Sequence, residues 1–438
     1  MSLDRQPPDS QDPPLGSLRV CILAEHASFS FGGEASLPLH YFSRLRARRI
    51  EAWLIVHGRT QSELQALFPD DQDRIQYIPD RWYHRLIWRL GRPLPRRISE
   101  ATFGILMVLI NQLIQRRMVR QLIHSRGINI VHQPIPVSPK APSFIWGLGA
   151  PVIIGPMNGG MDYPPAFRTA ESLGTRVSVW LGRLSATLVN GLISGKKRAS
   201  VLLVSNERTQ AALPGGVRGK IIVMPENGVD LSIWSPPPAS YGITQPPRFI
   251  FIGRLVDWKR LDFILHALVD CKGASLEVIG DGPMRDAWTD TAKKLGIADR
   301  VHWLGWLSQQ DCAKRLHGAT ALLLPSIYEC GGAVVLEAMA CALPVVALAW
   351  GGPAEYIDPT CGILISPSST ESIIKEFADA LQKLASNPAE QAELGLAGRK
   401  RVESHYDWNR KIDRMMDIYR RCLADHEAGQ HVARRLHN

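Results

Sequence analysis

Several features are scarce in these 438 residues, and each absence excludes a class of protein. No apolar run is long enough to span a bilayer. The seven cysteines are scattered and never spaced as C-x-x-C, which argues against a disulfide framework or a zinc site. No helix-turn-helix, zinc-finger or RNP-like pattern accompanies the basic residues, so nucleic acid is not the expected partner. Residues 1–16 are polar and proline-rich, and we expect a disordered lead there and not a signal peptide.

These absences predict a cytoplasmic protein that at most lies on the inner face of the cell membrane. Hydrophobic residues make up 45% and charged residues 21% of the chain, which is typical of a globular enzyme with two or three domains. The net charge of +10 favours anionic partners, such as nucleoside diphosphates or acidic lipid headgroups.

The clearest pattern in the chain runs from residue 322 to residue 357. A buried strand over Ala321–Leu324 is followed by Gly331–Gly332, which opens a helix rich in Ala, Leu, Met and Glu. A second strand over Val345–Ala349 is followed by Gly351–Gly352, which opens another helix. Since glycine lets a ligand approach the backbone and a helix start offers N–H groups, each turn is a candidate anion site.

Two carboxylates lie on either side of the first glycine turn. Glu329 comes just before it, and Glu337 lies about one and a half turns into the helix. A phosphate does not need carboxylates, but a nucleotide-sugar needs acceptors for its ribose and sugar hydroxyls. The spacing therefore favours a nucleotide-sugar over a simple phosphate.

This block resembles the retaining glycosyltransferases of family 4, which carry P-S, E-x-F-G, E-A-M-A, P-V-V and G-G-x-x-E in this order. The resemblance implies the GT-B fold, in which two doubly wound Rossmann-like α/β domains face each other across a cleft. At residue 331 this chain has glycine where the family usually has phenylalanine, which makes the turn more open. The matching residues are Pro325, Ser326, Glu329, Gly332, Glu337 through Ala340, Pro344 through Val346, Gly351, Gly352 and Glu355.

Two cations follow the expected strand over Arg248–Ile252. Arg254 and Lys259 are five residues apart and can converge on a diphosphate, which is their role in the resembled family. Fixed cations stabilise the charge that grows on the leaving group as the glycosidic bond breaks. We therefore expect Arg254, Lys259 and Glu329 to be the catalytic residues, with no metal ion and no other cofactor.

The resemblance also implies further contacts with the donor and the acceptor. Gly32 and Gly33 follow the expected first strand, and a simple packing turn is the alternative there. His132 or Asn158 is expected to contact the sugar or the acceptor, although a hydrogen-bonded structural histidine is an equally good interpretation of His132. The expected donor-binding residues are Gly32, Gly33, Gly253, Gly282, Trp306, Gly331, Gly332, Ala333, Glu337, Gly351 and Gly352.

A literal D-x-D occurs at Asp71-Gln72-Asp73. Metal-dependent glycosyltransferases of another fold bind a divalent cation through such a motif. Here no apolar strand leads into it, so we expect a solvated loop and assign no metal.

A basic and aromatic stretch lies between Arg81 and Arg120. Arginine with tryptophan and tyrosine on a helical period suits anionic headgroups, and we favour a membrane-surface contact for Trp82–Arg97. The apolar run Phe103–Ile114 is too short to span a bilayer and is either a core helix or an interfacial one.

The sequence thus predicts a hexosyl-type transferase that moves a sugar, with retention, to a hydroxyl acceptor, for which a lipid-linked saccharide in polysaccharide or glycolipid assembly is our preferred interpretation. The alternative is a non-catalytic membrane-surface partner that keeps the fold. The expected parts are a lead over 1–16, an acceptor-side domain over 17–225, a linker over 226–247, a nucleotide-sugar domain over 248–407, a helix over 408–425 that crosses back to the first domain, and a tail over 426–438.

Overall fold

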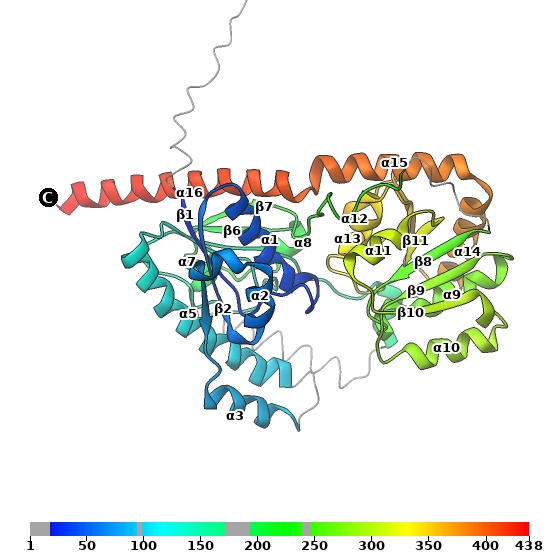
Figure 1. The fold of residues 1–438 in the computed structure, drawn as a ribbon, viewed down its shortest axis with the longest axis horizontal. Helices are drawn as coiled ribbons and strands as arrows, with labels where there is room; N and C mark the ends of the chain where they lie inside the picture. The colour runs from blue at the N-terminus through cyan, green and yellow to red at the C-terminus, as the bar shows by residue number, and fades with distance from the viewer. Residues whose placement is uncertain (1–17, 94–98, 171–192, 239–245, 438) are drawn as a thin grey trace, which may run out of the picture. The chain divides into compact units, whose positions relative to one another are not determined.

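The computed structural model describes residues 18–93, 99–170, 193–238 and 246–437 (Figure 1). The chain divides into two compact units. Unit 1 comprises Met1–Met157, Gly182–Met224 and Ile412–Asn438, and unit 2 comprises Asn158–Leu181 and Pro225–Lys411. The expected lead over 1–16 and the end of the Trp82–Arg97 stretch, residues 94–97, lie outside the described residues.

Unit 1 contains a seven-stranded sheet in the order β3-β2-β1-β4-β5-β6-β7, in which neighbouring strands are parallel. One face carries a cluster of buried side chains that includes Cys21, Ile55 and Val131 and packs against Val119 and Leu122 of helix α5. The strands are β1 (Arg19–Leu23), β2 (Glu51–His57), β3 (Ile75–Ile78), β4 (Ile130–Gln133), β5 (Val152–Met157), β6 (Val201–Val204) and β7 (Lys220–Val223).

The helices of unit 1 connect these strands, and α1 packs against β1 and β2. Its α-helices are α1 (Gly33–Ala47), α2 (Gln61–Leu67), α3 (Trp82–Gly91), α5 (Ile105–Arg126), α7 (Gly195–Arg198) and α8 (Glu207–Ala211). Its shorter helical turns are η2 (Gly58–Thr60), η3 (Pro69–Arg74) and the π-helical η4 (Glu100–Gly104).

Unit 2 contains a six-stranded sheet in the order β10-β9-β8-β11-β12-β13, again with parallel neighbours. Side chains alternate between two cores: Phe249 and Phe251 of β8 enter one cluster, and Ile250 enters the other. This alternation is typical of a parallel sheet buried on both faces. The strands are β8 (Arg248–Ile252), β9 (Ser275–Ile279), β10 (Val301–Gly305), β11 (Ala321–Leu324), β12 (Val345–Leu348) and β13 (Ile363–Ile365).

Helices cover both faces of this second sheet, with α9 against α14 and α12 against α15. They are α9 (Leu261–Asp270), α10 (Arg285–Lys294), α11 (Gln309–Leu316), α12 (Ala333–Ala340), α13 (Gly352–Tyr356), α14 (Thr370–Ser386) and α15 (Pro388–His405), with the 3-10 turns η5 (Pro165–Ala170), η6 (Asp257–Lys259) and η7 (Ala298–Arg300). The final helix α16 (Trp408–His437) begins in unit 2 and continues in unit 1.

The two doubly wound sheets confirm the predicted GT-B fold class. Three details differ from the sequence expectations. Strands β7 and β13 were not predicted, because both are short and lie at the edge of their sheets. Helix α16 continues to His437, well past residue 425, because the residues after His426 are mostly helix formers and contain no proline.

The apolar run Phe103–Ile114 lies mostly in α5, and its exposure fits neither a core helix nor an interfacial helix completely. Leu106 and Leu113 are exposed, whereas Asn111 and Gln112 are buried. Polar side chains therefore lie on the inner face of this part of the helix. Of the helices within the described residues, none combines the length and the apolar character needed to cross a membrane.

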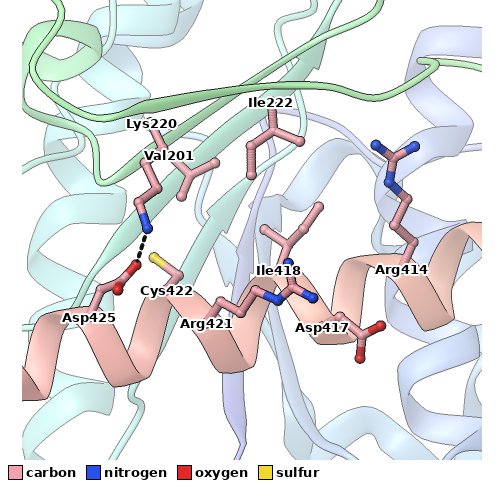
Figure 2. A pocket seen from close by; sticks show the side chains of 9 residues that line it. All are labelled: Val201, Lys220, Ile222, Arg414, Asp417, Ile418, Arg421, Cys422 and Asp425. Atoms are coloured by element: carbon pink, nitrogen blue, oxygen red, sulfur yellow. Dashed lines mark hydrogen bonds and ion pairs between the residues drawn. The ribbon is translucent and has the colours of Figure 1, made fainter. Parts of the chain in front are cut away.

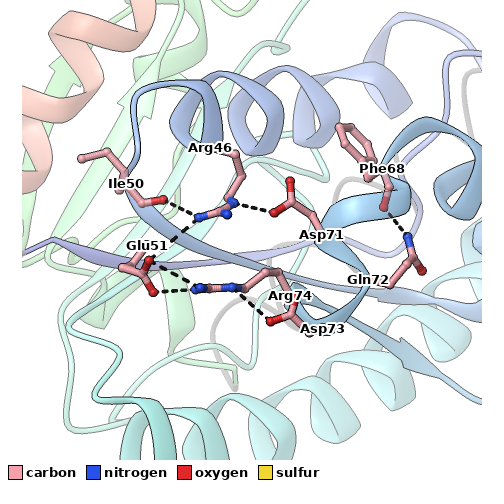
Figure 3. Close-up of polar contacts among 8 residues, drawn as sticks. All are labelled: Arg46, Ile50, Glu51, Phe68, Asp71, Gln72, Asp73 and Arg74. Atoms are coloured by element: carbon pink, nitrogen blue, oxygen red, sulfur yellow. Dashed lines mark hydrogen bonds and ion pairs between the residues drawn. The ribbon is translucent and has the colours of Figure 1, made fainter.

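The D-x-D residues belong to η3 and form ion pairs (Figure 3). Asp71 Oδ1 accepts a hydrogen bond from Arg46 Nε at 2.8 Å, and Asp73 lies 3.4 Å from Arg74. Arg74 also pairs with Glu51 at 2.5 Å. The expectation of a solvated loop is thus incomplete, because Asp71 ties η3 to helix α1.

Asp71→Ala should leave the activity expected from the family resemblance unchanged. It should reduce the free energy of unfolding by about 1 kcal/mol at most, because a partly exposed ion pair contributes little. Thermal unfolding and turnover of the same preparation measure the two effects. The exposed neighbour Asp70 provides the control, since Asp70→Ala removes a charge without this pair. A loss of turnover in Asp71→Ala that excess manganese reverses would instead identify the motif as a metal site.

Candidate functional site

Strands β8 and β11 are neighbours in the sheet of unit 2. From β8 the chain adds β9 and β10 on one side of this pair, and from β11 it adds β12 and β13 on the other. Ligands of doubly wound folds bind beyond the carboxyl ends of the strands at such a switch point. The segment after β8 carries Lys259, and the segment after β11 carries Glu329. Lys259 Nζ and Glu329 Oε2 form a direct ion pair, with 14% and 15% of their side chains exposed. The fold therefore brings together two residues that are far apart in sequence.

The turn from Glu329 to Gly332 is held by hydrogen bonds to its backbone carbonyls. The N–H of Gly352 donates to the carbonyl of Glu329 at 2.9 Å, and Asn158 Nδ2 donates to the carbonyl of Cys330 at 2.9 Å. A Cβ on Gly352 would lie 1.9 Å from the carbonyl oxygen of Gly331. The N–H of Gly352 is thus already used inside the protein, and the second glycine pair acts as a close-packed support for the first turn.

Helix α12 begins directly after this turn. Gly332 has a left-handed backbone with φ of 74°, which favours glycine, and no side chain from the described part of the chain caps the helix. The first N–H groups of a helix have no intrahelical acceptor, and the helix dipole favours negative charge there. Gly332 and Ala333 therefore stand where a phosphate oxygen would be stabilised.

Glu337 lies one turn further along α12. Within the described residues no hydrogen bond or ion pair reaches its carboxylate. Burial raises the pKa of Glu337 to about 7, because a desolvated carboxylate is poorly stabilised when it is charged. A ligand with hydroxyl groups would supply the missing hydrogen bonds, as the ribose of a nucleotide does.

The remaining predicted donor residues of unit 2 divide into exposed and packing positions. Arg254 is exposed, and in the described residues no partner engages its guanidinium, so an anion can reach it. Trp306 follows β10 and is also exposed. Gly282 is a packing position, since a Cβ there would lie 2.4 Å from the carbonyl oxygen of Leu255. The loop that begins at Gly253 carries both cations.

His132 is completely buried in unit 1. Its Nε2 donates to the carbonyl of Gly155 at 2.7 Å, so its Nδ1 accepts from the hydroxyl of Tyr419, also at 2.7 Å. This geometry favours the structural histidine over a sugar contact. Gly32, also in unit 1, precedes helix α1 with φ of 102°, and no heavy atom would contact a Cβ on Gly32 or Gly33 within 4 Å. Close packing therefore does not explain this glycine pair.

Sequence reasoning did not predict which residues of unit 2 support the turn from Glu329 to Gly332, called the donor turn below. Asn158, expected to touch sugar or acceptor, donates to the carbonyl of Cys330 in this turn. Met161 Sδ would lie 2.7 Å from a Cβ on Gly351, and the indole of Trp350 donates to the carbonyl of Asp162 at 2.9 Å. Only the glycine-rich sequence after Asn158 hinted at this role, because contacts so distant in sequence leave no local pattern.

Two other features could hold small ligands, and both lie in unit 1. Among the described residues one group has metal-ligand geometry, formed by His57, Asp80 and His84. The Nδ1 atoms of its two imidazoles already accept backbone N–H groups, from Arg59 and Arg81, which favours a structural role. A cavity of about 330 Å³ lies between α16 and strands β6 and β7, where Lys220 pairs with Asp425 at 2.7 Å (Figure 2).

The two doubly wound sheets define the class of this protein as GT-B. Solved structures agree on the fold: sucrose-phosphate synthase from Thermosynechococcus elongatus is 19% identical, with a TM-score of 0.61 over 93% of this chain and 100% of that chain. The HepE protein of Anabaena, in complex with UDP, is 16% identical, with a TM-score of 0.62 over 92% of this chain and 99% of that chain.

The family model of the glycosyl transferases group 1 matches residues 238–401. An alpha-maltose-1-phosphate synthase of Mycolicibacterium smegmatis is 30% identical over 284 residues, 58% of this chain and 70% of that protein. A D-inositol 3-phosphate glycosyltransferase of Mycobacterium marinum is 31% identical over 217 residues, 46% of each chain, so the match spans about half the length of that relative. The chain therefore belongs to the group 1 glycosyltransferases, which confirms the family resemblance.

Glu337→Gln should stabilise the protein at pH 8 but not at pH 5. Because the pKa of Glu337 is raised from 4.5 to about 7 on folding, the folded protein binds more protons, and stability falls as pH rises through this range. A neutral amide removes that loss, which is about 3 kcal/mol for such a shift. Thermal unfolding of both proteins from pH 5 to pH 8 measures it. A constant difference in melting temperature across this range would show that Glu337 is not desolvated.

Proposed function

We propose that the chain transfers a sugar from a nucleoside diphosphate sugar to a hydroxyl acceptor, with retention at the anomeric carbon. One observation carries the proposal. The Lys259–Glu329 ion pair forms at the switch point of unit 2, on the turn that opens the uncapped helix α12. A diphosphate that joins two sugar rings needs a cation and helix N–H groups for its phosphates, and carboxylates for the hydroxyl groups of its rings.

The diphosphate is bound by positive charge in this proposal. Lys259 and Arg254 bind the phosphates, and the N–H groups at the start of α12 add a fixed dipole. Negative charge increases on the diphosphate as its bond to the sugar breaks, so these groups stabilise the transition state more than the ground state. We propose that neither a metal ion nor another cofactor takes part.

The two carboxylates bind hydroxyl groups. Glu337 accepts from the ribose, and Glu329 contacts sugar hydroxyls near the reacting carbon. The bond between the anomeric carbon and the phosphate oxygen breaks, and a bond to the acceptor oxygen forms on the same face. The departing phosphate takes the acceptor proton, so the mechanism needs no protein nucleophile.

The related proteins support a hexosyl donor. They include glycogen synthases and D-inositol 3-phosphate glycosyltransferases, and one structural neighbour is in complex with UDP-glucose. We propose the same donor class for this chain, with its acceptor-side domain in the first half, over 17–225, and its nucleotide-sugar domain over 248–407.

Lys259→Ala should reduce turnover by about 10²- to 10³-fold, because it removes a cation from the leaving group. Transfer or donor hydrolysis measures the loss once a thermal-shift panel of nucleoside diphosphates has identified the base, since bound ligand raises the melting temperature. Lys293→Ala is the matched control, because Lys293 is an exposed lysine of unit 2 that pairs only with Asp290 among the described residues. Turnover like that of the wild type in Lys259→Ala would contradict the proposal.

The alternative is a non-catalytic membrane-surface partner with the same fold. Gly331, where the family usually has phenylalanine, is the feature that favours it. The ion pair of Lys259 with Glu329 argues against it, because it places a cation and a carboxylate at the switch point where ligands of doubly wound folds bind. Donor hydrolysis measured without any acceptor separates the two functions.

A surface on helix α3 supports a membrane-bound acceptor. Trp82 and Trp88 are 71% and 63% exposed, and Leu86 and Leu90 are also exposed. Arg81, Arg85, Arg89 and Arg92 are exposed on the same short helix and its ends. Exposed apolar side chains among arginines are typical of helices that lie at an anionic bilayer surface. We therefore propose peripheral binding to the inner face of the cell membrane and a lipid-linked saccharide as acceptor.

Liposome flotation tests this surface. Arg85→Glu together with Arg89→Glu should weaken binding to anionic vesicles by at least about 25-fold, since each cation contributes about 1 kcal/mol at such a surface. The matched control reverses Lys293 and Lys314, which are exposed in unit 2. If the wild type binds neither anionic nor neutral vesicles, the membrane proposal is wrong, while donor hydrolysis still tests the transferase.

A further inference from the structure

Gly331 is the one residue of the donor turn that departs from the family pattern, and its surroundings explain why it is glycine. A Cβ on Gly331 would lie 2.4 Å from Asn227 Nδ2 and 3.4 Å from Glu226 Oε2. Real Cβ atoms do not approach a heavy atom as closely as 2.4 Å. The backbone of Gly331 is not in the left-handed region, so its own conformation does not require glycine. The space for a side chain at residue 331 is occupied by Asn227.

Asn227 is held firmly in this position. It is buried, and its Nδ2 donates to the hydroxyl of Tyr356 at 3.1 Å. The next residue, Gly228, packs against Trp408, whose ring would lie 3.0 Å from a Cβ there. The carbonyl of the preceding Glu226 accepts a hydrogen bond from the buried Lys411. Because the backbone on both sides is held, Asn227 could yield only by rotating its side chain, which would break the buried hydrogen bond to Tyr356.

The same turn carries the carboxylate that pairs with Lys259. Its backbone is supported by Gly352 at the carbonyl of Glu329 and by Asn158 at the carbonyl of Cys330. At Gly331 the amide of Asn227 occupies the space that a side chain would need. Three segments that are distant in sequence thus reach three consecutive residues of the turn.

We propose that Asn227 is a positioning residue for Glu329: its amide fills the place of a side chain at residue 331 and fixes the turn that presents the Glu329 carboxylate. Asn227 and Gly331 then form a matched pair: the amide of Asn227 fits in this position only because residue 331 has no side chain. This inference rests on the proposed function, in which Glu329 contacts the sugar and not the nucleotide.

The proposal makes a selective prediction. Loss of Asn227 should disturb chiefly the carboxylate of Glu329, which we propose contacts the sugar. The diphosphate and ribose contacts at Arg254, Lys259, Glu337 and the start of α12 lie on other residues and should remain. Asn227→Ala should reduce kcat/KM for the donor at least tenfold and leave the Kd of the free nucleoside diphosphate within about twofold. A purely structural role would lower the melting temperature without this difference between the two ligands.

The experiment is a double-mutant cycle on the full chain. Asn227→Ala, Gly331→Ala and the double variant are compared by thermal unfolding, by calorimetric Kd for UDP, GDP and ADP, and by hydrolysis of UDP-glucose, GDP-mannose and ADP-glucose. Each single variant should be impaired, the first by a void and the second by the clash. The double variant should recover kcat/KM to within about threefold of the wild type, because the shortened side chain at residue 227 leaves room for the added methyl group at residue 331.

Two further variants keep the test decisive. Tyr356→Phe removes only the hydroxyl that accepts from Asn227, and it should give a smaller loss with the same selectivity if Asn227→Ala does not fold. Gly215→Ala is the silent control, since no heavy atom lies within 4 Å of a Cβ there.

Additive effects in the cycle, or equal weakening of donor and free nucleotide in Asn227→Ala, would overturn the inference. If the wild type binds no nucleotide of the panel, the proposed function fails instead. The double-mutant cycle then still decides whether Asn227 and Gly331 are matched, because a matched pair makes their effects on the melting temperature non-additive.

Discussion

A charged pair at the start of a helix is the interaction on which the rest of this site depends. Lys259 and Glu329 come from segments after two neighbouring strands, and each neutralises the other in a place with little solvent. A single buried charge at this place would be costly, so each side chain offsets the burial of the other. The pair therefore holds a cation and a carboxylate in place where we propose that a diphosphate sugar binds. The uncapped start of α12 adds its dipole, so the account needs no divalent cation.

The glycines of unit 2 serve this pair in different ways. Gly332 takes a left-handed conformation that lets α12 begin directly after the turn. Gly351 and Gly352 admit the backbone of residues 329–331 at close range, and Gly331 leaves room for the side chain of Asn227. A site made of backbone and fixed charges is rigid only if its support is close-packed. The stability of the donor turn therefore depends on close packing by residues from other segments of unit 2.

Local sequence patterns predicted most of the parallel strands and both glycine turns, because alternating buried side chains and helix starts are properties of short segments. The family resemblance assigned Lys259 and Glu329 to one site, but their direct ion pair was not predicted and is seen only in the structure. Local patterns failed where a contact joins distant segments. Apart from the glycine-rich sequence after Asn158, nothing near Asn158 or Asn227 indicates a contact with the donor turn, and nothing near His132 indicates that Tyr419 would occupy its Nδ1. The D-x-D shows the same limit, because its ion pair to Arg46 lies 25 residues away.

Dependence on divalent metal is the most direct measure of the central claim, that side-chain cations and helix amides alone stabilise the departing diphosphate. Hydrolysis and transfer of the nucleotide-sugar are measured in metal-free buffer with EDTA, and again after addition of magnesium or manganese. The account predicts rates that agree within about twofold under all conditions. Loss of activity in EDTA, followed by recovery with either cation, would contradict it.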